Sequence, residues 1–367
     1  MSSSTIGINP EAGTSALDNS FLETVVLHNR DYQQYSINNQ WLRRASLIRP
    51  PLKEEVERLQ IVHNVLNLVF DGRLLFPPLT RPRRILDLGY GSASWAIEVA
   101  EQNERADVQM TGLVQRVGLC HKEGCRKGCW SMEGTNFKSQ VLGVDINPWQ
   151  PEEVPRNLYL QVDDLNRTQV ASLPHTFDLV HSRMMASGIH VNRWRDYVRD
   201  MFRVTRPGGW SQMVELYFNV QSDNGSLSDD HALRQWSTRY MESLEGLKDL
   251  RVPLRLPNMM RDAGFVDVEH RMVMLHTCAW STGRKPLLAV KEITQENVKL
   301  VQQIVRTCSA SSLRWLYIPS LRDWGEFPTI LSSSMRLTEF GRMTIQDVHL
   351  LVAQARLEAD NPAFKVL

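Results

Sequence analysis

The chain has 367 residues, which is enough for two domains or for one α/β domain with a helical addition. Lys and Arg number 42 against 41 Asp and Glu, so a net charge of +1 gives no electrostatic reason to expect nucleic acid or an anionic membrane as a partner. No apolar run reaches the roughly 18 residues of a membrane span, and five cysteines do not make a secreted disulfide framework, so we expect a soluble, cytoplasmic or nuclear protein without a signal sequence.

Residues 1–45 form the first predicted unit. Ser, Thr, Asn and Gly dominate its first 30 positions, so we expect it to be largely disordered. After Pro50 and Pro51, apolar residues recur at helical spacing over 54–69 and predict an amphipathic helix that packs on an α/β core. His63 lies within this helix, where we favour a hydrogen-bonded structural role.

The next stretch predicts a strand, a tight turn and a helix. The apolar run Ile85–Leu88 contains Asp87 and leads into Gly89 and Gly91, and a helix follows as far as about Gln102. The first glycine permits a sharp bend, and the second lets backbone N–H groups approach a ligand at the N-terminus of the helix. A G-x-G sequence alone is weak evidence for a nucleotide-like site.

Residues 103–139 interrupt this pattern with a Gly-rich, basic stretch. Cys120, Cys125 and Cys129 lie in it, but their spacing matches none of the usual paired C-x2-C zinc patterns, so we expect no metal. Asp145 lies 54 positions beyond Gly91, and removing these 37 residues leaves 17, close to the usual spacing of about 20. We therefore interpret 103–139 as a surface insertion.

Three further strands are predicted, and each ends in polar groups. The first spans 140–144 and is followed by Asp145, the second spans 158–162 and is followed by Asp163 and Asp164, and the third spans 177–180 and is followed by His181. Ligands of open parallel sheets bind outside the carboxyl ends of the strands. We therefore expect these side chains and Asp87 to converge on one crevice, with Asp145 accepting both hydroxyls of a ribose.

The second half of the chain continues the alternation. A helix is predicted over 194–204, a fifth strand over 210–218 with Glu215, a helix over about 231–247, and a sixth strand over 265–275 after the segment 259–264. Apolar stripes at 298–308 and 345–355 predict two more helices, which either pack on the core or form a cap.

The ligand that fits these features has a ribose and an adenine but no phosphate. A dinucleotide site needs a third small residue for helix packing three positions after the second glycine, where Ser94 stands, and no P-loop sequence is present. S-adenosylmethionine is such a ligand.

Five motifs carry a resemblance to a known family: ILDLGYGSASWAIEVAE, VLGVDINPWQP, NLYLQVDDLN, FDLVHSRMM and RVTRPGGWSQMVEL. With AGFVDV and the C-terminal HLLVAQARLEADNPAFK, they resemble the fungal class I methyltransferases of the LaeA-like, TAM-domain type over most of residues 46–365. The resemblance implies an α/β fold, with a Rossmann-like S-adenosylmethionine-binding domain over 46–278 and a helical, substrate-covering cap over 279–367.

The resemblance also implies roles for individual residues. Asp87 and the turn Gly89-Tyr90-Gly91 would hold the methionine part of the cofactor, and Asp145 the ribose. The adenine would lie at Asp163, Asp164 and Leu165, with His181 near the sulfonium.

The chain departs from the family pattern in three places. Tyr90 replaces a small polar residue and Ala93 a glycine, and the 103–139 insertion has no counterpart. Only Val366 and Leu367 follow the segment that precedes the last strand of the family, so we expect that strand to be truncated.

Methyl transfer mainly requires alignment of donor and acceptor and exclusion of water. If a base is needed, His181 and Glu215 are the candidates, although the spacing of neither singles it out. The first hypothesis is a methyltransferase that tailors a small molecule of secondary metabolism. The alternative is a methyltransferase-like regulator that acts through protein partners, and a nicotinamide-dependent oxidoreductase ranks third because of Ser94.

Overall fold

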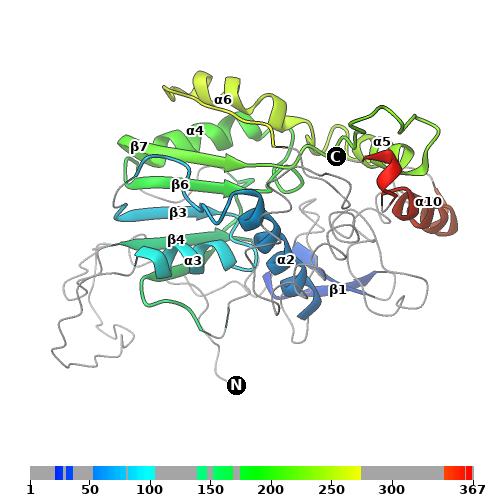
Figure 1. Cartoon of the computed structure of the whole chain (residues 1–367). Coiled ribbons are helices and arrows are strands. Elements are labelled where there is room, and N and C mark those ends of the chain that lie inside the picture. The colour runs from blue at the N-terminus through cyan, green and yellow to red at the C-terminus, as the bar shows by residue number, and fades with distance from the viewer. Residues whose placement is uncertain are drawn as a thin grey trace, which may run out of the picture.

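The structure is a computed structural model, and it describes residues 21–27, 30–35, 53–79, 82–103, 139–146, 151, 153–167, 174–273, 343–359 and 361–365 (Figure 1). Within these ranges, no helix is both long enough and apolar enough to cross a membrane.

A five-stranded parallel sheet forms the centre of the molecule, in the order β5-β4-β3-β6-β7 (Figure 1). The strands are β3 (Arg84–Leu88), β4 (Gln140–Asp145), β5 (Leu158–Val162), β6 (Phe177–Arg183) and β7 (Thr205–Val214). The chain starts at β3, moves outward to β5, returns to β6 and continues to β7. This is the doubly wound, Rossmann-like order, and the direction reverses at the carboxyl ends of β3 and β6.

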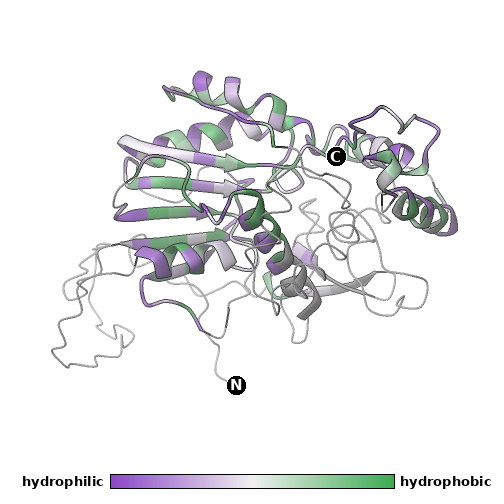
Figure 2. Ribbon diagram, in the orientation of Figure 1, coloured by the Kyte–Doolittle hydropathy of each residue, from purple (hydrophilic) through white to green (hydrophobic). Residues whose placement is uncertain are grey.

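Helices cover both faces of the sheet, which is why its inner strands are apolar runs (Figure 2). On one face, Ile85, Val141 and Leu179 pack with Trp95 and Val99 of α3 (Ser94–Asn103), and α2 (Lys53–Val69) packs on α3. On the other face, α4 (Trp194–Val204) contributes buried residues to a second core. Side chains alternate between the two faces along each strand. The register of the strands therefore places four polar residues on the face that α2 and α3 cover: Asp87, Asp145, His181 and Arg183.

The structure confirms the predicted helices at 54–69, after the glycine turn and at 194–204, and the strands at 85–88, 140–144 and 158–162. The fourth predicted strand is too short, because β6 continues through His181, Ser182 and Arg183. These polar residues remain in the strand because they find partners there: the Ser182 hydroxyl, for example, is 2.8 Å from that of Tyr197. The insertion lies outside the described residues, apart from its terminal Asn103 and Ser139.

The fifth strand was predicted at 210–218, but β7 begins at Thr205 and ends at Val214. Its pairing with β6 is irregular between Phe177 and Leu179, so the Pro-Gly-Gly sequence lies in a bulge within the strand instead of before it. Glu215 consequently follows the strand directly.

After β7, the structure confirms the helix predicted over about 231–247 but not the sixth strand. Helix α5 spans Ala232–Ser243, η3 spans Val252–Leu254, and α6 spans Leu256–Ala263 and ends at Gly264 in the left-handed conformation. The prediction of a sixth strand over 265–275 was wrong for its described part. Residues 265–273 form no strand, and no further strand pairs with β7 in the described sheet. Without that pairing Val266 is 80% exposed and Met272 71% exposed.

Helix α10 (Ile345–Ala359) confirms the helix predicted from the apolar stripe at 345–355, and η4 (Pro362–Phe364) follows it. Val348, Val352 and Ala355 are buried, and α10 packs against α5. The carboxylate of Glu358 accepts hydrogen bonds from the N–H groups of Ala232 and Leu233 at 3.0 and 2.7 Å, which caps the N-terminus of α5. The stripe at 298–308 lies outside the described residues, and the cap stays a prediction.

Part of the N-terminal unit forms an antiparallel hairpin of β1 (Thr24–Leu27) and β2 (Arg30–Gln33). The expected disorder therefore does not apply to this stretch. The Gln33 amide reaches the carbonyl of Phe21 at 2.8 Å and that of Ile146 at 3.4 Å, which attaches the hairpin beyond the end of β4.

Candidate ligand site at the carboxyl ends of the strands

The glycine turn joins β3 to α3 at the reversal point of the sheet. Gly89 has a φ of +85°, and its N–H donates to the carbonyl of Val144 at 2.7 Å. A Cβ at this position would collide with Sδ of the buried Met185. The backbone conformation therefore favours glycine, and a larger residue would also have to displace the Met185 side chain.

The two departures from the family turn have structural explanations. Tyr90 does not crowd the mouth of the turn, because its ring is buried in the core beside Leu160 and Gly143. Ala93 adopts a φ of +60°, which glycine would accept without strain, and its methyl group is fully buried. Tyr90 therefore belongs to the core, and its backbone N–H and carbonyl are hydrogen-bonded to Val144 and Ala93.

Asp145 links the end of β4 to this turn. Its Oδ2 accepts the N–H of Gly91 at 2.9 Å, and its carbonyl accepts the N–H of Asp163 at 3.0 Å. The carboxylate is 1% exposed. The sequence prediction that Asp145 lies beside the glycine turn is confirmed.

The predicted adenine-binding segment is held by Tyr35, which follows the N-terminal hairpin. The Tyr35 hydroxyl donates to Oδ2 of Asp164 at 3.0 Å, and Oδ1 of Asp164 accepts the N–H of Asn166 at 2.9 Å. Burial, followed by the charge of Asp164, raises the pKa of Tyr35 to about 12. Leu165 is buried in the core, so Asp164 and Leu165 have structural contacts of their own, and Asp163 lies nearer the turn.

Asp87 is an acid within β3, 2% exposed. Burial raises its pKa to about 7, the nearby Arg183 acts in the opposite direction, and Asp145 raises it further. Arg183 is the last residue of β6, two positions beyond His181, which pairs with Asp87. An acid and a cation therefore lie on the same face of the neighbouring strands β3 and β6, where the order of the strands reverses.

His181 occupies a different position from the one expected. Its ring is 1% exposed and stacks on Trp95 at a centroid distance of 3.7 Å. The amide of Gln212 donates to the carbonyl of Leu74 and, at 2.9 Å, to Nδ1 of His181, so the proton is on Nε2, which has no hydrogen-bond partner among the described residues. Burial lowers the pKa of His181 well below its usual value. A neutral histidine within the strand and beneath a tryptophan does not support the predicted role as a base.

Glu215, the second candidate base, accepts the N–H groups of Met185 and Ala186 at 2.9 and 3.0 Å. Burial raises its pKa to about 7, while these two hydrogen bonds lower it. Its carboxylate therefore closes the loop that follows β6. A catalytic role for Glu215 stays a prediction.

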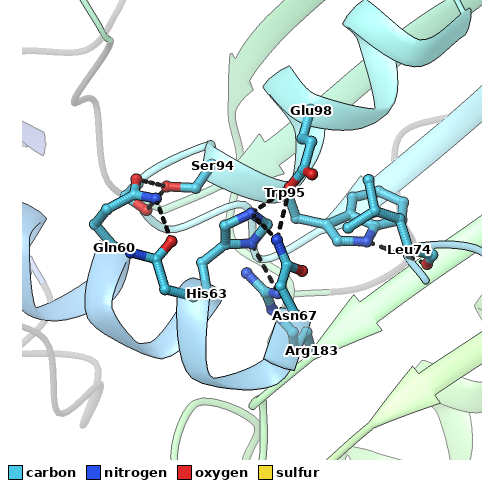
Figure 3. A network of polar contacts seen from close by, with 10 residues as sticks. Gln60, His63, Asn67, Leu74, Ser94, Trp95, Glu98 and Arg183 are labelled. Carbon is cyan, nitrogen blue, oxygen red and sulfur yellow. Dashed lines mark hydrogen bonds and ion pairs between the residues drawn. The ribbon is translucent and has the colours of Figure 1, made fainter. Parts of the chain in front are cut away.

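The position of α2 over the site could not be predicted from the helical stripe alone. Leu59 would be 3.5 Å from a Cβ on Gly91, and the Ser94 hydroxyl donates to Oε1 of Gln60 at 2.7 Å (Figure 3). The signal that was available is the helical stripe at 54–69, which precedes the strand and glycine motif in the chain.

His63 joins α2 to α3 and β6 (Figure 3). Its Nε2 lies 2.6 Å from the carboxylate of Glu98, which also accepts the amide of Asn67 at 2.8 Å, and its Nδ1 lies 3.3 Å from Nη1 of Arg183. Since Arg183 can only donate, Nδ1 accepts and Nε2 donates to Glu98. The predicted hydrogen-bonded role of His63 is confirmed.

These residues fit the donor and acceptor pattern of S-adenosylmethionine. Asp145 is an acceptor suited to ribose hydroxyls, and Asp87 and Arg183 match the ammonium and carboxylate of an amino acid. Among the described residues, no group of three His, Cys, Asp or Glu could hold a metal ion, and Cys120, Cys125 and Cys129 lie outside them.

Comparison with known proteins identifies the family. Residues 61–270 match the family described as Methyltransferase domain. The Secondary metabolism regulator laeA of Fusarium oxysporum is 26% identical over 235 residues, covering 63% of this chain and 64% of that protein. Methyltransferase pytC of Aspergillus terreus is 24% identical over 277 residues, covering 74% and 72%. The chain thus spans just under two thirds of the regulator.

Among solved structures, human N-acetylserotonin methyltransferase in complex with SAM is 13% identical, over 60% of this chain and 54% of that one, with a TM-score of 0.34.

Proposed function

The chain belongs to the Methyltransferase domain family. We propose that it transfers the methyl group of S-adenosylmethionine to a small molecule of fungal secondary metabolism. The cofactor of this fold is S-adenosylmethionine, which supplies an activated methyl group on a sulfonium.

One observation supports the proposal above all others. The acid at the end of β4 accepts the N–H of Gly91 at 2.9 Å, at the carboxyl edge of a sheet whose order reverses at β3. A carboxylate that could accept the hydroxyls of a ribose thereby lies beside a glycine turn, at the edge where doubly wound folds bind nucleosides. Because the turn offers few phosphate-binding features and Ser94 replaces the third small residue, an adenosine without phosphate is favoured over a dinucleotide.

The chain's own residues would bind, orient and shield the reactants. Asp145 and the glycine turn would hold the adenosine, and Asp87 and Arg183 would face the amino acid end. Helix α2 lies across the turn through Leu59 and Gln60, which favours exclusion of water from the methyl group. Alignment and a dry site supply most of the rate of an in-line displacement, so no base is required for a good nucleophile.

The relatives support a second candidate function. The laeA protein is named a regulator and pytC a methyltransferase, and this chain is similar to both. In the alternative, the same site binds the cofactor but acts on or through a protein partner in the nucleus or cytoplasm.

A comparison of fungal strains tests the proposal. We would delete the gene in its native host and restore either the wild type or Asp145→Ala, and then profile small molecules by mass spectrometry with methyl-labelled methionine in the medium. Small-molecule tailoring predicts that individual labelled products disappear, their unmethylated precursors accumulate, and only the wild type restores them. Broad loss of whole compound families without accumulated precursors would contradict it and favour the regulator.

A further inference from the structure

Residues 184–186, which we call the β6 bend, follow β6 directly and pack on the glycine turn. Met184 adopts the left-handed conformation with a φ of +59°. The side chain of the next residue, Met185, is buried where a Cβ on Gly89 would collide with it. The β6 bend therefore lies beside the proposed cofactor site, at the point where the order of the strands reverses.

The left-handed conformation is unusual for Met184, because its side chain has no group that could hydrogen-bond to the local backbone. Such strain persists only where the surrounding structure holds the chain in place, and it is common at functional sites. Here the N–H of Met184 donates to the carbonyl of Val214 at 2.8 Å. The N–H groups of Met185 and Ala186 donate to the two carboxylate oxygens of Glu215 at 2.9 and 3.0 Å.

The carboxyl ends of the strands divide the crevice into two sides. In the proposed function the cofactor lies at the ends of β3 and β4, so the methyl acceptor approaches from the side of β6 and β7. The segments that leave these two strands, 184–189 and 214–218, contain one charged residue, Glu215, and the β6 bend occupies both of its oxygens. Met184 is half-buried at this side. A charged acceptor would lose its hydration here without gaining a partner from these segments.

Resting on the proposed function, we infer that Met184 contacts a methyl acceptor that is apolar around its reacting atom, and that Glu215 is the positioning residue for Met184. Glu215 acts by holding the β6 bend in its strained conformation, not by taking a proton. This inference gives the acceptor a chemical class and gives Glu215 a role other than the base predicted from the sequence.

Urea unfolding of the purified full chain tests the relation between the two residues. Met184→Gly relieves the strain of the left-handed conformation, and Glu215→Gln places an NH2 group against a backbone N–H. If Glu215 imposes the strain, the relief should disappear in the Glu215→Gln background, where Met184→Gly should change the urea midpoint less favourably than in the wild type. Glu215→Asp, which withdraws the carboxylate by one methylene, serves should Glu215→Gln not fold.

His175→Gly is the matched control for this measurement. His175 has a φ of +57°, is exposed and precedes the same strand at its opposite end, so its effect on the midpoint should be equal in both backgrounds. An effect of Met184→Gly that is also equal in both backgrounds would overturn the positioning role of Glu215.

The deletion strain fed with methyl-labelled methionine tests the contact with the acceptor. Met184→Leu keeps the apolar volume and should restore the labelled products to within about twofold of the wild type. Met184→Gly should lower them at least about tenfold, because a pocket loses several methylene contacts. Purified Met184→Gly should still bind S-adenosylhomocysteine with unchanged affinity, and His175→Gly should match the wild type in both measurements.

Three results would overturn the inference: full restoration by Met184→Gly, weakened binding of S-adenosylhomocysteine in that variant, or labelled products with a charged group next to the methylated atom. A wild type that restores no labelled product would instead overturn the proposed function.

Discussion

The backbone N–H of Gly91 donates to Oδ2 of Asp145 at 2.9 Å, although the two residues are 54 positions apart in the chain. This hydrogen bond joins the turn after β3 to the end of β4 and fixes the carboxylate where an adenosine would lie. The glycine turn and the acid therefore form one structural unit in the absence of any ligand.

Asp145→Ala is expected to weaken the binding of S-adenosylhomocysteine by about 1.5–3 kcal/mol, because the ribose would lose a charge-assisted pair of hydrogen bonds. Calorimetry measures the change. Asp229→Ala is a suitable control, because the Asp229 side chain is 92% exposed and should not affect binding. Equal affinity in both variants would show that Asp145 does not hold the ribose.

Gly89→Ala is expected to destabilise the fold more than Gly246→Ala. Both glycines have similar positive φ values, +85° and +80°, so each substitution should cost about 1–2 kcal/mol in backbone strain. A Cβ at Gly89 would also meet Met185, whereas nothing lies within 4 Å at Gly246. Urea unfolding measures the difference. Should the two variants lose the same stability, Met185 does not pack against Gly89 as described.

Asp87→Asn is expected to stabilise the protein more at pH 8 than at pH 5. Burial raises the pKa of Asp87 to about 7, above its ordinary 3.8, so the folded state retains a proton that the unfolded state has released between these values. The stability linked to Asp87 is therefore complete below pH 3.8 and lost as the pH rises through 7. Chemical unfolding at both pH values measures the gain.

The exposed Asp196, with a side chain 62% exposed, provides the control through Asp196→Asn. A gain from Asp87→Asn that does not change with pH would contradict the raised pKa. Asp87→Asn should also weaken the binding of a ligand that carries an ammonium group.

The attachment of α2 is expected to loosen in acid. Burial, and then the charge of Arg183, lowers the pKa of His63 below 6.5, so its contribution to stability is present above 6.5 and lost as the pH falls. A proton on Nδ1 would also turn the contact with Arg183 into a meeting of two donors. Hydrogen exchange should show lower protection of α2 at pH 5.5 than at pH 7.5 in the wild type, after correction for intrinsic rates. His63→Gln should show no such change, and an equal change in both would contradict this account.

The sequence predicted the centre of the fold because buried parallel strands read as apolar runs with polar ends. Asp87 within β3 and Asp145 at the end of β4 were placed correctly for that reason. His181 was misplaced because its polarity suggested the end of a strand, whereas stacking on Trp95 and a hydrogen bond from Gln212 allow it to remain inside β6. A single sequence does not show which polar residues find buried partners.

The contact between the segment after the N-terminal hairpin and the strand ends could not be predicted for a similar reason. Tyr35 reaches Asp164, 129 positions away, and its surroundings in the sequence are polar and weakly patterned. The roles of α2 and Arg183 likewise depend on contacts between distant segments. The domain boundaries at 45 and 278 and the C-terminal cap stay predictions.

Isothermal titration of the purified full chain with S-adenosylhomocysteine, and separately with NAD, distinguishes an S-adenosylmethionine site from a dinucleotide site. We expect saturable binding of one S-adenosylhomocysteine per chain, weakened by Asp145→Ala, and no binding of NAD. Binding of NAD without binding of S-adenosylhomocysteine would contradict this expectation.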